Sequence, residues 1–298
     1  AYAYSDKYKK KTLRLGDLLH LDKPHIQSRL KTMLEYKNLE LGGCYHQAPM
    51  SYPALLSWCE KKAEQFAPYI TNTGNYITAA LSNHQKVVLE AQLGAMRDID
   101  YGIFPYTSSS STISAYGPIG AGIPGTLPDH IVGVLKAYST CVGAGPFTAE
   151  KAMPEKWMES LRKSGGEYGA ATGRPRRVGP FDAVASAYGL KCQNADKIAL
   201  TKLDVLSRMD EIPVITAYKL NDELITEFDP LDDLDSMTPV IQTLPGWNTD
   251  ISKCRKYEEL PENARKYIET LEHLLNHEIQ FISVGAERNQ YLTKGEWL

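Results

Sequence analysis

Apolar side chains recur at helical spacing in three stretches of the chain. Residues 26–34, 55–63 and 264–275 each carry apolar positions three or four residues apart, which predicts amphipathic helices. Pro53 and Pro261 stand near the starts of the last two stretches, where a missing amide hydrogen costs little. The pattern therefore predicts a mainly helical first third and a strong helix near the end.

Short apolar runs between these stretches predict buried strands, at residues 87–89, 131–138, 198–200, 214–218 and 281–282. Helices are expected between them at 155–162, which ends near a Gly165-Gly166 turn, and at 182–190. Strands that alternate with helices indicate an α/β fold with an open, mostly parallel sheet, whose ligands bind beyond the carboxyl ends of the strands. A loop rich in Ser, Gly and Pro covers residues 98–128, and such long loops are often functional.

Composition narrows the class of partner. Of the 298 residues, 43% are hydrophobic and 23% charged, as in globular proteins that bury a core. A formal charge of -3 gives no reason to expect nucleic acid or an anionic membrane as partner, and no stretch is apolar enough to span a bilayer. The five cysteines are scattered without metal-ligand spacing, so we expect no bound zinc and a cytoplasmic location.

The segment Thr201-Lys202-Leu203-Asp204 follows one of the predicted strands. Because side chains alternate along a strand, Lys202 and Asp204 are expected on the same side of its end. A carboxylate there can accept hydrogen bonds from both N1–H and N2–H of guanine, while the lysine stem lies along the ring. Adenine lacks this donor pair and would be rejected. The alternative interpretation is an exposed Lys and Asp at a strand end, because the pattern is short.

Three arginines stand close together in Gly173-Arg174-Pro175-Arg176-Arg177, behind Gly169-Ala170-Ala171-Thr172. Guanidinium groups bind carboxylates through two parallel hydrogen bonds, and the small residues would let backbone amides approach the same anion. This pattern predicts a dicarboxylate site. A solvated basic turn is the alternative.

Other motifs are weaker. The run Ser108 to Ser111 offers donors for a phosphate, although loop solubility explains it equally well. Residues 120–125 match GxGxxG but do not follow a strand, which argues against a dinucleotide site, and no GxxxxGK[ST] phosphate loop occurs. His273 and His277 share a helix face without a third ligand, so no metal is assigned to them.

Eight segments resemble, in order, motifs of the adenylosuccinate synthetase family. They read AYSDKYKKKTLRLGDL, DIDYGIFPYTSSSST, KAYSTCVGAGPF, GGEYGAATGRPRRVG, LTKLDVL, TLPGW, LPENARKYIE and FISVGAER. The resemblance covers Ala3 to about Arg288. It implies one α/β domain over residues 1–298 that is similar to P-loop NTPases and N-terminally incomplete. Within it, a mainly helical dimerisation part at 1–85 would precede a nucleotide- and aspartate-binding part at 86–298.

The family joins IMP and L-aspartate using GTP: the γ-phosphate activates the purine O6, and the aspartate amine then displaces it to give adenylosuccinate, on the route to AMP. For GTP, the resemblance implies that Lys202 and Asp204 contact guanine while Ser283 and Gly285 close over it. For L-aspartate, it implies carboxylate contacts from Ala171, Thr172, Gly173, Arg174 and Arg176.

For IMP, the resemblance implies contacts from Ser108 to the phosphate and from Val142 to the ribose, with Gln92 and Arg174 also at this ligand. Lys10 would reach the IMP phosphate of a partner subunit, which implies a homodimer. Mg²⁺ is the implied cofactor. The family's GDEGKGK loop and its catalytic aspartate and histidine are not in this sequence, so catalytic residues stay unassigned and this chain is expected to be inactive alone.

Several positions depart from the family pattern, mostly toward IMP or aspartate. Lys10 and Cys141 replace arginines, Ser108 and Ala171 replace threonines, and Gln92 begins an altered Gln-Leu-Gly order. The guanine motif is intact. Two alternatives therefore stay open: a phage-type synthetase that uses dGMP as acceptor, and a non-catalytic nucleotide-binding or dimerisation module.

Overall fold

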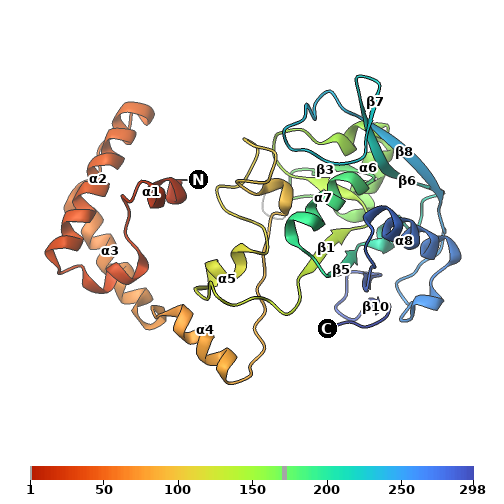
Figure 1. Ribbon diagram of the computed structural model, residues 1–298. Helices are drawn as coiled ribbons and strands as arrows, with labels where there is room; N and C mark the ends of the chain where they lie inside the picture. The colour runs from red at the N-terminus through yellow and green to blue at the C-terminus, as the bar shows by residue number, and fades with distance from the viewer. Residues whose placement is uncertain (1, 170–172) are drawn as a thin grey trace. The chain divides into compact units, whose positions relative to one another are not determined.

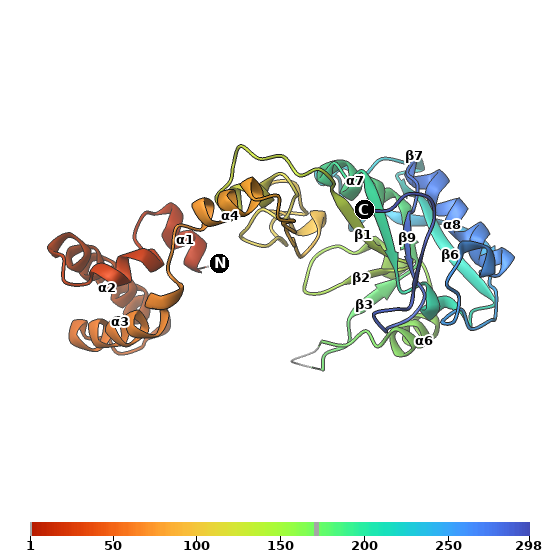
Figure 2. The same cartoon turned by 90° about the horizontal axis from the view of Figure 1, so that it is seen from below.

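The computed structural model describes residues 2–169 and 173–298, which fall into two compact units (Figures 1 and 2). The first unit comprises Ala1–Leu89 with Pro118–Gly125, and the second comprises Glu90–Gly117 with Thr126–Leu298.

The first unit is helical. Its elements are α1 (Tyr2–Tyr8), η1 (Leu15–His20), α2 (Pro24–Tyr45), α3 (Tyr52–Phe66), η2 (Ala67–Tyr69) and α4 (Thr73–Ser82), and the short α5 (Tyr116–Ala121) begins in the second unit and ends in the first. The predicted helices at 26–34 and 55–63 are confirmed as parts of α2 and α3. Pro53 lies in the first turn of α3, where the Ser51 side chain accepts a hydrogen bond from the Ala54 amide.

The second unit contains the strands, which form three sheets among the described residues. In the first, β1 (Val132–Lys136), β5 (Lys197–Thr201) and β9 (Phe281–Ser283) run parallel, and β10 (Tyr291–Thr293) is antiparallel to β9. In the second, β6 (Glu211–Leu220) pairs with β4 (Phe181–Asp182) in parallel and with β7 (Glu223–Ile225) and β8 (Thr238–Pro245) antiparallel. The third pairs β2 (Ser139–Cys141) with β3 (Arg177–Gly179). The α/β class is confirmed, but only the first sheet is mostly parallel.

Helices of the second unit pack on these sheets (Figure 1). They are α6 (Glu155–Gly165), α7 (Ala183–Gln193) and α8 (Glu262–Leu275), with short 3-10 turns η3 (Ala95–Arg97), η4 (Thr148–Lys151), η5 (Leu203–Leu206) and η6 (Tyr257–Glu259). α7 contacts β6 and α8. The apolar stripe predicted for α8 is fully buried, through Ala264, Tyr267, Ile268, Leu271 and Leu275. The Tyr267 hydroxyl donates to the Ala137 carbonyl at 2.6 Å, which fixes α8 beside the end of β1.

Two features differ from the sequence prediction. Residues Val87, Val88 and Leu89 form no strand, and the Val88 side chain is 88% exposed. Three apolar residues without a pairing partner do not suffice for a strand. The longer β8 escaped prediction because its residues are half-buried or exposed and its aliphatic run, Val240-Ile241, is only two residues long.

Gly246 is required by a close backbone approach. Its amide donates to the Asp210 carbonyl at 2.7 Å, and a Cβ at this position would lie 1.7 Å from the Met209 carbonyl oxygen. Since that oxygen is backbone, it cannot rotate away. We expect Gly246→Ala to lower the free energy of unfolding by about 1–3 kcal/mol, as overpacking does.

The matched control is Gly189→Ala in α7, where the nearest atom to a new Cβ is 3.7 Å away. Alanine is favoured over glycine within a helix by about 0.5–1 kcal/mol, so this variant should be as stable as the wild type or more so. Urea unfolding of both variants checks the prediction, and equal stabilities would contradict it.

Asp182 ends β4, caps the N-terminus of α7 and is almost completely buried. Its carboxylate accepts from the Ala185 amide at 3.0 Å and from the Tyr218 hydroxyl at 2.7 Å. Burial raises the pKa of Asp182 to about 6, and these two hydrogen bonds offset only part of that shift. The folded protein therefore binds a proton on this group over a pH range in which the unfolded chain has already released it.

The stabilising contribution of that proton is present below about pH 4 and is lost as pH rises to about 6. Asp182→Asn keeps a side chain that caps helices but does not titrate. We expect the difference in unfolding free energy, wild type minus variant, to fall by about 1–3 kcal/mol between pH 4 and 7. Urea unfolding at several pH values measures it; a difference that is constant with pH would disprove the raised pKa.

Candidate functional site

Chemistry-bearing side chains gather at one edge of the first sheet. Because β1, β5 and β9 are parallel, their carboxyl ends meet at that edge. Lys136 ends β1, Lys202 and Asp204 follow β5, and Ser283 ends β9 with Gly285 two residues on. The structure thus brings together the four residues predicted to bind guanine.

Lys202 has a left-handed backbone, with φ of 60°, and starts the turn η5. The strand therefore ends at Thr201. Lys202 and Asp204 do not belong to a strand, so the prediction that they lie on the same side because strand side chains alternate is wrong in its reasoning. The Lys202 ammonium instead turns toward the end of α6, where it donates to the Gly165 carbonyl at 2.7 Å and to Glu167 Oε1 at 3.0 Å.

Asp204 lies in η5 and is half-buried. Burial raises the pKa of its carboxyl, and the only hydrogen bond recorded for that carboxyl within residues 2–169 and 173–298 comes from its own backbone. Both carboxylate oxygens therefore retain acceptor capacity toward a ligand. Nearby, the Ser283 hydroxyl donates to the Gly285 carbonyl at 3.0 Å, and a Cβ at Gly285 would lie 2.2 Å from Gln290 Oε1.

Glu167 is the centre of a charged cluster and is fully buried. Its Oε1 accepts from the Tyr138 hydroxyl at 2.7 Å, from Lys202 Nζ at 3.0 Å and from Lys136 Nζ at 3.1 Å, while Oε2 accepts from Arg176 Nη1 at 2.8 Å. Burial by itself would raise the pKa of Glu167, but the hydrogen bonds from Tyr138, Lys202 and Lys136 outweigh it and lower the pKa to about 2. The carboxylate is therefore ionised throughout the physiological range.

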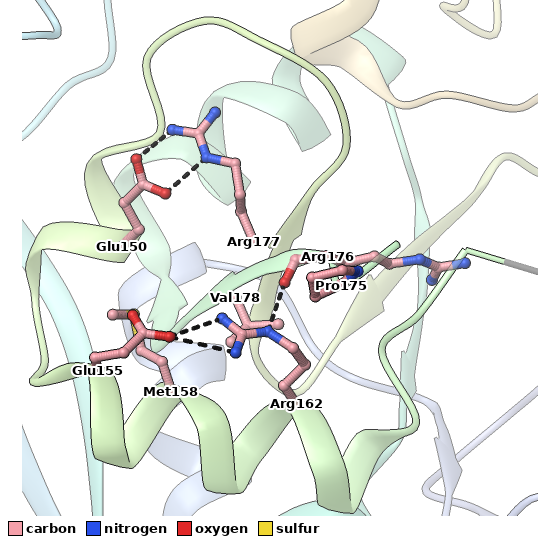
Figure 3. Close-up of a pocket in the computed structure, with 8 residues that line it drawn as sticks. All are labelled: Glu150, Glu155, Met158, Arg162, Pro175, Arg176, Arg177 and Val178. Carbon is pink, nitrogen blue, oxygen red and sulfur yellow. Dashed lines mark hydrogen bonds and ion pairs between the residues drawn. The ribbon is translucent and has the colours of Figure 1, made fainter. Parts of the chain in front are cut away.

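Two of the three arginines of the predicted carboxylate site, Arg176 and Arg177, point in different directions (Figure 3). Arg177 forms an ion pair with Glu150 and donates to the Gly143 and Gly145 carbonyls, so it holds the loop after β2. Arg176 extends away from this pair toward Glu167, and its buried Nε has no hydrogen-bond partner among the described residues. The Nε–H of Arg176 is therefore a hydrogen-bond donor that no described residue of the protein uses.

A pocket of about 460 Å³ lies between α6 and β3, lined by Glu150, Glu155, Met158, Arg162, Pro175, Arg176, Arg177 and Val178 (Figure 3). Arg162 donates through Nε to the Arg176 carbonyl and pairs with Glu155 on the same helix. The pocket therefore presents three guanidinium groups, each of which already has a carboxylate partner.

The loop before the arginines has a defined base. The Gly173 amide donates to the Gly169 carbonyl at 2.7 Å, and the Gly169 amide donates to the Arg174 carbonyl at 2.8 Å. Gly173 has a φ of 64°, which favours glycine. The predicted contacts Ala171 and Thr172 lie outside the described residues.

Arg97 joins two of the predicted IMP contacts. Its carbonyl accepts from the Ser108 amide at 2.8 Å, and its Nη2 donates to the Val142 carbonyl at 3.1 Å and to Cys141 Sγ at 2.7 Å. Asp98, fully buried, accepts from the amides of Asp100, Tyr101 and Thr112 and orders the same loop. Ser108 and Val142 therefore belong to one bonded assembly.

The other predicted IMP contacts are Gln92, Lys10 and Arg174, of which Arg174 belongs to the arginine loop described above. Gln92 is an exposed loop residue of the second unit. Lys10 belongs to the first unit, in an exposed turn after α1 with a φ of 59°.

Sequence reasoning missed Glu167, Tyr138, Lys136 and Arg97. Glu167 stands alone between glycines and a tyrosine in Gly165-Gly166-Glu167-Tyr168-Gly169, and nothing in that pattern reveals that three cations will surround it. The one available signal was an acidic residue seven positions before the first arginine of the cluster, Arg174.

No group of three or more His, Cys, Asp or Glu side chains within residues 2–169 and 173–298 is arranged to hold a metal ion. In the same residues, every helix is too short or too polar to cross a bilayer.

Comparisons with known proteins agree on one family. The sequence profile of adenylosuccinate synthetase matches residues 1–292. The adenylosuccinate synthetase of Carboxydothermus hydrogenoformans is 40% identical over 97% of this chain and 67% of its own length, and that of Staphylococcus saprophyticus is 36% identical over 99% and 69%.

A solved structure leads to the same family. Fully ligated adenylosuccinate synthetase from Plasmodium falciparum superposes with a TM-score of 0.86 and 33% identity, over 98% of this chain and 68% of that one. A cyanophage S-2L succinoaminodeoxyadenylate synthetase reaches only 0.42 with 13% identity, a likeness too weak to support the dGMP alternative. With these matches over nearly its full length, the chain belongs to the adenylosuccinate synthetase family, the GTP-dependent ligases that join IMP and L-aspartate.

Proposed function

We propose that this chain contributes the guanine-binding and aspartate-binding parts of the synthetase site. The guanine-binding part rests on one observation, the half-buried Asp204 carboxylate at the sheet edge. Among the described residues, this carboxylate accepts a hydrogen bond only from its own backbone. Two acceptor oxygens at this place fit the N1–H and N2–H donors of guanine. Lys202 lies beside it, and Ser283 and Gly285 line the neighbouring strand end.

Arg176 supports the aspartate part. The Arg176 side chain is 32% exposed, so its guanidinium can donate to a ligand carboxylate. Arg174 and the loop at residues 171–173 complete the proposed contacts. A lysine offers only a point charge and could not reproduce this fork-like recognition.

The IMP part rests on the assembly around Arg97, where Ser108 would contact the phosphate and Val142 the ribose, with Gln92 and Arg174 nearby in the bound state. Lys10 would act across a homodimer interface. Mg²⁺ is used with the nucleotide, but the described residues do not offer it a protein ligand set, so no residue of this chain is assigned to it. A cytoplasmic location accords with five free thiols.

The expected inactivity of the isolated 298-residue polypeptide stays a prediction. It is tested by assaying GTP-dependent formation of adenylosuccinate from IMP and L-aspartate with this polypeptide alone. Product above the enzyme-free background would refute it.

Asp204→Asn tests the guanine assignment. An asparagine offers one acceptor and one donor group in place of two acceptors, so it cannot accept from both guanine donors. We expect GDP binding to weaken by about 10- to 100-fold, the worth of hydrogen bonds to a charged group, with ADP binding unchanged. Calorimetric titration of the 298-residue chain with each nucleotide gives the ratio.

The control is Asp222→Asn, which makes the same chemical change in the exposed turn between β6 and β7. It should keep the wild-type preference for GDP over ADP. Burial raises the pKa of Asp204, so its carboxylate is protonated at a higher pH than an exposed aspartate. As the pH is lowered, the wild-type preference for GDP over ADP should therefore be lost at that higher pH. An unchanged GDP to ADP ratio in Asp204→Asn would rule out this base readout.

A further inference from the structure

One buried carboxylate connects the two proposed binding sites. Glu167 lies between α6 and the arginine loop, and no part of its side chain is exposed. It receives Lys202 from the guanine side and Arg176 from the aspartate side. These residues come from segments far apart in sequence, so the contact between the two sites runs through this side chain.

The two carboxylate oxygens of Glu167 accept hydrogen bonds from different donors. Oε2 is bonded to Arg176 Nη1, whereas Oε1 is shared by Lys202, Lys136 and the Tyr138 hydroxyl. The backbone reinforces the link, since the Arg176 amide donates to the Glu167 carbonyl at 2.9 Å. A movement of either cation therefore changes the hydrogen bonding available to the other.

The cluster carries more positive than negative charge. Lys136, Lys202 and Arg176 face the single carboxylate of Glu167 at 2.8–3.1 Å. Burial lowers the pKa of Lys136, although the bond to Glu167 offsets part of the shift. Like charges in a poorly solvated region repel one another, so a further anion at Arg176 would relieve that repulsion.

We propose that Glu167 is a positioning residue that holds Lys202 and Arg176 in one network and so couples binding of the guanine base to binding of the dicarboxylate. This inference rests on the proposed function, because it takes Lys202 and Arg176 as ligand contacts. Glu167 itself touches neither ligand. It acts by fixing where the two cations stand.

The coupling has a sign. A dicarboxylate that binds Arg176 adds the missing negative charge to the cluster. It also accepts hydrogen bonds from Arg176 that Glu167 would otherwise accept, so Glu167 then bonds more strongly to Lys202. Occupancy of the aspartate site should therefore tighten guanine nucleotide binding, and by linkage the nucleotide should tighten aspartate binding by the same factor. A purely structural ion-pair network would stabilise the fold without any such dependence.

The test is calorimetric titration of the 298-residue chain with GDP, with and without saturating L-aspartate. In the wild type we expect aspartate to tighten GDP binding by about fivefold or more, the lower end of usual coupling. In Glu167→Gln the shape is kept but the charge is lost, so GDP alone should bind about tenfold more weakly and the effect of aspartate should disappear.

Two further variants keep the test decisive. Tyr138→Phe removes the one uncharged donor to Glu167 and leaves all three cations, so it should retain the wild-type coupling. Glu167→Asp preserves the charge but shortens the reach by one methylene, and it replaces Glu167→Gln if thermal unfolding shows that the latter does not fold. It should lose the coupling as well.

The outcomes separate the two proposals. In one outcome, the wild type prefers GDP through Asp204, but the folded Glu167 variants keep the wild-type coupling. This result would overturn the role of Glu167 and leave the proposed function standing. A wild type without any preference for GDP over ADP would overturn the proposed function, and this inference with it. Loss of coupling in the Glu167 variants but not in Tyr138→Phe supports the inference.

Discussion

The balance of charge around Glu167 is the constraint on which the site depends. A carboxylate with no exposed surface is stable only if hydrogen bonds and opposite charges replace the water it has lost, and Glu167 obtains one hydroxyl and three cations. Those cations come from the end of β1, the segment after β5 and the loop before β3. Three separate parts of the second unit are thus tied to one group.

The fold explains why these parts meet. Parallel pairing of β1, β5 and β9 places three carboxyl ends at one edge, and α6 ends beside that edge at Gly165. Gly166 then turns the chain in a left-handed conformation, which directs Glu167 inward. The tight backbone contact at Gly165, where a Cβ would lie 2.4 Å from the Tyr138 hydroxyl oxygen, leaves little freedom in this arrangement.

Much of the fold was predictable from the sequence, because its helices and central strands follow simple apolar periodicity. α2, α3, α8 and β5 were placed from that pattern alone, and the site motifs were found from residue types after strand ends. The pattern failed where burial depends on distant partners. Residues 87–89 look like a strand but are not paired, and β8 is paired although its sequence looks unremarkable for a strand.

The same limit applies to the site. Lys202 and Asp204 could be named from a local motif, but the left-handed turn at Lys202 could not, because non-glycine residues rarely adopt it and tertiary contacts impose it here. The role of Arg177 as a brace for the loop after β2 likewise depends on Glu150 and Gly145, and the burial of Glu167 depends on Lys136. These partners lie 27 or more residues away in the chain. The local sequence does not reveal which distant charged residues will neutralise a given side chain.

The most direct test of this account is a crystal structure of the chain grown with GDP and L-aspartate. The account predicts guanine N1–H and N2–H within hydrogen-bond distance of the Asp204 carboxylate. It also predicts an aspartate carboxylate on Arg176, with Glu167 still bonded to Lys202. A guanine base bound elsewhere, or an Asp204 carboxylate turned away from the bound base, would contradict it.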